Sequence, residues 1–123
     1  MNKTVKRILL IGDDGSVVRL VRANIEKVHP EMKVESAMSG VQGMQMIDSP
    51  GQAFDLVIVT TLLLSDVPSY EILEHLRRMY PGVKVLVLSG GPNPPDACPM
   101  HAFLAKPVLP DTLVRMVEQL MAT

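Results

Sequence analysis

The chain has 123 residues, of which 47% are hydrophobic and 20% charged, and its formal net charge is -1. This composition predicts one globular domain over residues 1–123 and excludes a polybasic protein, so we expect no direct nucleic-acid binding and no membrane attachment. The single cysteine, Cys98, excludes an internal disulfide, and no apolar run is long enough for a secretion signal, which favours a cytoplasmic protein.

Strand and helix patterns alternate along the chain. Short apolar runs bounded by turn residues predict buried strands, and apolar residues three or four positions apart predict helices. In chain order we expect strand 7–11, helix 16–29, strand 33–37, helix 41–47, strand 55–60, helix 69–80, strand 83–88, strand 101–105 and helix 110–121. The inward face of the first helix is predicted to comprise Val17, Leu20, Val21, Ile25 and Val28.

Residues 89–99, SGGPNPPDACP, contain four prolines and two glycines, which an ordinary helix does not tolerate. Strands that alternate with helices predict a parallel sheet covered on both faces. We therefore expect an α/β, flavodoxin-like (βα)5 doubly wound domain with a five-stranded parallel sheet in the order 2-1-3-4-5. The helix before the fifth strand is expected to be shortened or replaced by a proline-rich loop.

Polar residues follow the first and third predicted strands, which are neighbours in this order. Asp13 and Asp14 come directly after the first strand, and Thr60 ends the third. Ligands of such sheets bind where the carboxyl ends of the strands meet at the switch point. The two aspartates are thus expected to face Thr60 across a shared crevice.

Four sequence features together indicate a family. They are the acidic pair after ILLIG, the strand DLVIV, Ser89 at the end of VLVLS, and Lys106-Pro107 in FLAKP. Over essentially its whole length the chain resembles the receiver domains of two-component response regulators, the CheY-like family.

That resemblance implies a phosphorylation switch. In receivers, two acidic residues hold Mg²⁺, an aspartate ending the third strand accepts the phosphoryl group, and a hydroxyl residue and a lysine contact its oxygens. It implies that Asp13 and Asp14 form the metal site and that Ser89 and Lys106 contact the phosphate. Phe103 matches the switch aromatic, and the bond before Pro107 is expected to be cis.

The phosphoacceptor position departs from the family because Thr60 occupies it. A threonine hydroxyl is a weak nucleophile unless a base or metal activates it, so we expect no catalytic residue there. Loss of one carboxylate should leave a weak or vestigial Mg²⁺ site at Asp13 and Asp14. The Lys106 ammonium is then expected to bond to one of these aspartates and to the Thr60 hydroxyl.

Simpler interpretations remain open for the same residues. Asp13 and Asp14 fit the cap of a helix, Thr60 fits a β-branched residue ending a strand, and Phe103 fits a core position. The scattered histidines do not have the spacing of a zinc site.

Three functions follow from these alternatives. The first is a pseudo-receiver, not an enzyme, that acts in a two-component or phosphorelay system through protein contacts. Its partner would be a histidine kinase, a phosphotransfer protein or an output domain, with a homodimer also open. The second is phosphorylation on a surrogate carboxylate, Asp66 or Asp14, with Mg²⁺. The third is a small flavodoxin-like binder of a phosphate-bearing ligand.

Overall fold

The computed structural model describes residues 6–51, 53–60, 66–90 and 100–122. Within them the strands and helices follow the expected order, and no helix is described between β4 and β5. The elements are β1 (Arg7–Ile11), α1 (Gly15–Val28), β2 (Lys33–Ala37), α2 (Gly40–Asp48), β3 (Leu56–Val59), α3 (Ser69–Met79), β4 (Lys84–Ser89), β5 (Ala102–Ala105) and α4 (Pro110–Met121).

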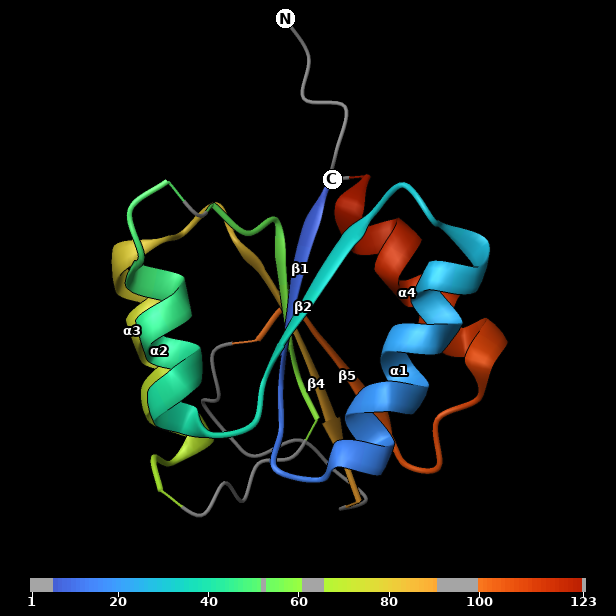
Figure 1. Ribbon diagram of the computed structural model, residues 1–123, viewed down its shortest axis with the longest axis horizontal. Coiled ribbons are helices and arrows are strands. Elements are labelled where there is room, and N and C mark those ends of the chain that lie inside the picture. Colours follow the sequence, from blue (N-terminus) through green and yellow to red (C-terminus); the bar gives the residue numbers. More distant parts are fainter. Residues whose placement is uncertain (1–5, 52, 61–65, 91–99, 123) are drawn as a thin grey trace, which may run out of the picture.

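The strands form one parallel sheet in the order β2-β1-β3-β4-β5, which confirms the predicted flavodoxin-like topology. Figure 1 shows the sheet nearly edge-on, with α1 and α4 on one face and α2 and α3 on the other. Since all strands run in the same direction, their carboxyl ends meet at one edge, the lower edge in Figure 1.

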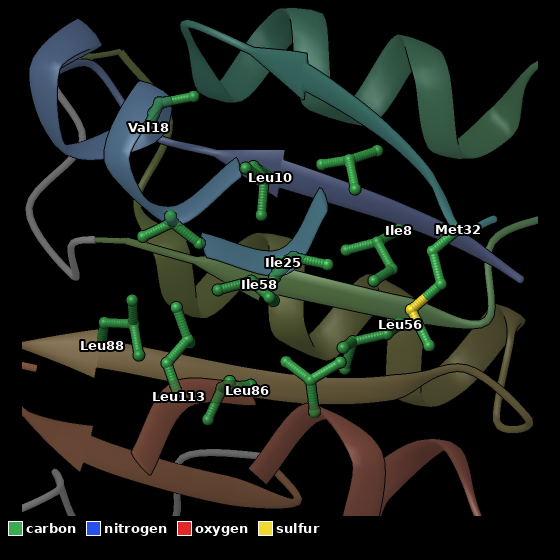
Figure 2. Close-up of a cluster of buried hydrophobic side chains, with 13 residues drawn as sticks. Ile8, Leu10, Val18, Ile25, Met32, Leu56, Ile58, Leu86, Leu88 and Leu113 are labelled. Carbon is green, nitrogen blue, oxygen red and sulfur yellow. The ribbon is translucent and has the colours of Figure 1, made fainter. Parts of the chain in front are cut away.

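Alternation along the strands divides the core into two clusters. Ile8, Leu10 and Ile58 point to the face covered by α1 and α4, whereas Leu9 and Ile11 point to the opposite face. Figure 2 shows the first cluster, in which Val18 and Ile25 of α1 and Leu113 of α4 meet the strand residues. A sheet buried on both faces explains why the strands read as continuous apolar runs.

The inward face predicted for α1 is partly wrong. Val21 and Ile25 are buried as expected, but Leu20 is 59% exposed and Val28 is 51% exposed. Val18, which the prediction omitted, is buried instead. Val17 is partly buried against the same core cluster, so the helix faces the sheet through Val18, Val21 and Ile25, with Val17 at the margin.

Two further expectations concern the connection before β5 and attachment to a membrane. The proline-rich connection expected in place of a helix falls mostly on residues 91–99, which lie outside the described residues. Among the described helices, none is both long and apolar enough to cross a membrane.

Candidate functional site

The predicted site residues come together at the carboxyl edge of the sheet. Asp13 and Asp14 follow β1, Thr60 follows β3, Ser89 is the last residue of β4, and Lys106 follows β5. The order of the strands places β1 beside β3 and β4 beside β5. The structure thus assembles the acidic pair and Thr60 on one side of this edge and the Ser89–Lys106 pair on the other.

Thr60 is buried, with 1% of its surface exposed. Its backbone amide donates to the carbonyl of Ile11 at 2.9 Å, which continues the pairing of β3 with β1. Its hydroxyl points to the same carbonyl, at a long 3.4 Å. The side chain lies over the end of β1, and its described hydrogen-bond partner is a backbone acceptor and not a base.

Asp14 caps helix α1. Its Oδ1 accepts from the hydroxyl of Ser16 at 2.7 Å, from the amide of Ser16 at 3.0 Å and from the amide of Val17 at 3.5 Å. These bonds lower the pKa of Asp14, the one from the Ser16 hydroxyl most strongly. The positive charge of Lys106 lowers it least. The capping interpretation therefore holds for Asp14, while Asp13 is exposed beside it.

Ser89 and Lys106 are joined through the backbone. The Lys106 amide donates to the Ser89 carbonyl at 2.8 Å, and the Lys106-Pro107 bond is cis, as predicted. Among the described residues the Lys106 ammonium has no ion pair, so the predicted bond to an aspartate and to Thr60 is wrong. The Lys106 charge reaches Asp14 only as a weaker, longer-range effect.

Phe103 lies on β5, half-buried. It packs against the core cluster beneath α2 and α3. Its core interpretation is therefore supported by the structure, and its expected role as a switch aromatic stays a prediction.

Similar proteins were found by sequence and by structure. No protein-family model matches the chain. The transcriptional regulatory proteins GlrR of Escherichia coli K12 and QseF of Escherichia coli O157:H7 are each 24% identical over 96% of this chain, which spans 27% of their length.

Solved structures match over nearly the whole chain. A CheY-like receiver domain protein from Methanospirillum hungatei JF-1 has a TM-score of 0.85 at 23% identity, covering 97% of this chain and 95% of that one. CheY4 of Vibrio cholerae gives 0.83 at 20% identity, over 95% and 99% of the two chains. TrrA of Thermotoga maritima, in complex with Mg(2+)-BeF, gives 0.83 at 19% identity, over 94% and 98%. The chain has the CheY-like receiver fold. The resemblance predicted from the sequence is thereby confirmed.

The donors at the carboxyl edge of this receiver fold do not match a full Mg²⁺ site. Across the described ranges, no three His, Cys, Asp or Glu side chains lie close enough together to hold a metal ion. One oxygen of Asp14 is taken by the start of α1, and Thr60 offers a hydroxyl that points to Ile11. Mg²⁺ requires near-octahedral oxygen ligation, which these donors do not supply.

The role of Asp66 was missed from the sequence. Its Oδ1 accepts from the amide of Gly40 at 2.9 Å and its Oδ2 from the amide of Val41 at 3.0 Å. These bonds, Val41 first, lower the pKa of Asp66. Asp66 thus ties the segment before α3 to the start of α2, beside the local cap in which Ser39 Oγ accepts from Gln42 at 3.1 Å.

Proposed function

We propose that this receiver fold is a pseudo-receiver, a non-enzymatic signalling domain of a two-component or phosphorelay system that acts by protein contacts. The observation that carries the proposal is Thr60 at the phosphoacceptor position, buried and with its hydroxyl directed to the Ile11 carbonyl. Activation of a hydroxyl needs a base or metal within reach, and a carbonyl oxygen cannot remove the proton.

The surrogate carboxylates lend little support to the second function. A nucleophilic carboxylate needs a free oxygen, yet both oxygens of Asp66 accept backbone amides. In Asp14, Oδ1 accepts three donors at the start of α1. Phosphorylation of Asp66 would use an oxygen that binds the start of α2, and phosphorylation of Asp14 would neutralise the carboxylate whose Oδ1 caps α1. We therefore propose that both serve as caps.

The third function, binding of a phosphate-bearing ligand, is not favoured at the start of α1. The amides of Ser16 and Val17, which could bind an anion at the start of α1, already point to the Asp14 carboxylate. An anionic ligand would compete with a carboxylate fixed two residues away.

The partner that fits is another component of the same signalling system. GlrR and QseF, the sequence relatives, are transcriptional regulators more than three times as long as the aligned region. We infer that this domain signals, in the cytoplasm, to a histidine kinase, a phosphotransfer protein or an output domain, or to a second copy of itself. Magnesium binding at Asp13 and Asp14, if measured, should be much weaker than in a receiver with three carboxylates.

The decisive experiment is intact-mass spectrometry after incubation with Mg²⁺ and acetyl phosphate. Wild type and Thr60→Ala should show no phosphoryl adduct, whereas Thr60→Asp restores a carboxylate beside Asp13 and should gain one. Thr60→Ala is the matched control because it removes the hydroxyl without adding an acceptor. An adduct on the wild type that Asp66→Ala or Asp14→Ala abolishes would establish the surrogate mechanism and overturn the pseudo-receiver.

A further inference from the structure

Gly12 and Thr60 lie side by side where β1 and β3 end. The paired residues Ile11 and Val59 form the last rung of these strands, and the next residues along are Gly12 and Thr60. Gly12 is buried, and its amide donates to the carbonyl of Ala37 at 3.1 Å. The backbone at position 12 is therefore held between β2 on one side and Thr60 on the other.

The Thr60 hydroxyl occupies the space that a side chain at position 12 would need. A Cβ atom built on Gly12 would lie 1.9 Å from Thr60 Oγ1, 3.2 Å from Thr60 Cβ and 3.3 Å from Val18 Cγ2. The first of these distances is too short for two atoms that are not bonded to each other. The other two contacts need a shift of only a few tenths of an ångström. The conflict is thus concentrated on one atom, Oγ1.

One bond rotation decides where that atom lies. Side chains adopt staggered χ1 rotamers, and for a β-branched residue the choice is narrow. With glycine at position 12, the rotamer that places Oγ1 over β1 is open. A Cβ at position 12 would close this rotamer and turn the hydroxyl away from β1.

We propose that Gly12 is the positioning residue for the side chain at position 60. It opens a space over β1 into which Thr60 folds, and this withdraws the Thr60 hydroxyl from the site. The proposal deepens the proposed function by giving a second reason for a silent position 60, but its test does not depend on phosphorylation.

A packing role for Gly12 that does not involve Thr60 predicts a different result. If position 12 needed glycine only for contacts with Val18 or the backbone of β2, then the cost of Gly12→Ala would be the same whatever residue stood at position 60. Coupling between neighbouring residues appears as non-additivity in a double-mutant cycle. The cycle here joins Gly12→Ala with Thr60→Ala, which removes Oγ1 and leaves Cβ.

The first measurement is the Thr60 χ1 angle from three-bond NMR couplings of its methyl carbon to the backbone nitrogen and carbonyl carbon. Wild type should show one dominant rotamer, with the hydroxyl over β1, and Gly12→Ala should shift the couplings to another. A wild-type side chain that averages over rotamers, or an unchanged rotamer in Gly12→Ala, would overturn the proposal.

The second measurement is thermal unfolding of the four proteins of the cycle. Gly12→Ala should lower Tm by several degrees when Thr60 is present and by clearly less in the Thr60→Ala background. Should Gly12→Ala fail to fold alone, folding of the double variant would support the proposal in the same way. Equal losses of Tm in both backgrounds, or two unfolded proteins, would leave Gly12 as a packing residue and overturn it.

Discussion

The two edges of the sheet hold their charged residues in different ways. At the carboxyl edge, carboxylates bond to backbone amides: Asp14 caps α1 and Asp66 caps α2. At the amino edge the Asp55 carboxylate also accepts from a backbone amide, that of Arg7, but other carboxylates there bond to side chains. There Asp48 Oδ1 accepts from His75 Nε2 and from the Tyr80 hydroxyl, both at 2.8 Å.

This difference follows from the direction of the helices. In a parallel α/β sheet every helix begins at the carboxyl edge, where its free amides attract carboxylates, and ends at the amino edge. Close packing reinforces the contrast, because Gly12 and Gly40 at the carboxyl edge have neighbours where a Cβ would stand. Substitutions should therefore cost most at the carboxyl edge, while effects at the amino edge should be small and depend on pH.

The largest effect is expected from Gly40→Ala at the carboxyl edge. An added Cβ would lie 2.7 Å from Val67 Cβ and 3.2 Å from the Val67 carbonyl oxygen, neither of which can move freely. Overpacking of this kind costs about 1–3 kcal/mol. The control is Gly82→Ala, because nothing lies within 4 Å of a Cβ there. Urea unfolding of both variants would contradict the comparison if they lost equal stability.

A smaller loss is expected from Asp66→Ala, which leaves the amides of Gly40 and Val41 without their acceptor. The lowered pKa of Asp66 sets the pH dependence. A depressed carboxyl pKa contributes stability above the unfolded value of 3.8, and this contribution disappears as the pH falls through the lower folded value. The wild type and Asp66→Ala should therefore converge in Tm in acid. Asp66→Asn, which keeps one acceptor oxygen, should lie between them.

Much of this architecture could be predicted from the sequence because it depends on local patterns. The strand 33–37 and the helix 110–121 agree with the observed bounds, since turn residues and a proline mark their ends. The strand order followed from the alternation of elements. The face of α1 was wrong at Leu20 and Val28 because helical spacing alone cannot choose between neighbouring apolar stripes of one helix.

The site was predictable in place but not in detail. The order 2-1-3-4-5 brought Asp13, Asp14 and Thr60 to one edge, where the register of β1 with β3 also places Gly12 beside Thr60. What the sequence could not provide was the rotamer of Thr60, which depends on the space left beside Gly12. The bond from Asp66 to Gly40 joins residues 26 positions apart, and no local pattern marks such a contact.

At the amino edge, His29 should stabilise the protein more in acid than in base. Its Nε2 lies 2.6 Å from Glu118 and its Nδ1 lies 3.1 Å from Glu31, so the doubly protonated ring satisfies both carboxylates. The bond to Glu118 is the main cause of a raised pKa for His29. A raised pKa contributes stability that is fully present below the unfolded value of 6.5 and is lost as the pH rises through the folded value.

Glu118→Gln tests this link because it removes the charge and keeps an acceptor. Both partners are partly solvated, so the loss should be about 0.5 kcal/mol or less. The difference in Tm between wild type and Glu118→Gln should be largest below pH 6.5 and should shrink above it. A difference that stays constant across this range would show that packing of the side chain, not charge, connects α4 to the end of α1.

The smallest effect is expected at His101, with the opposite sign. Its Nδ1 accepts from the amide of Val85 at 3.0 Å, which a protonated Nδ1 cannot do. Burial, and then the charge of Lys84, lower the pKa of His101. A depressed histidine pKa favours the neutral ring in the fold, so its contribution is present above the unfolded value of 6.5 and is lost as the pH falls below it. His101→Asn keeps an acceptor for Val85 without titrating, and its Tm should therefore fall less than that of the wild type on acidification. Parallel curves of Tm against pH for the two proteins would mean that the amide of Val85 bonds to water when His101 is protonated. Of these two histidines, only His29 would then contribute to the pH dependence of the amino edge.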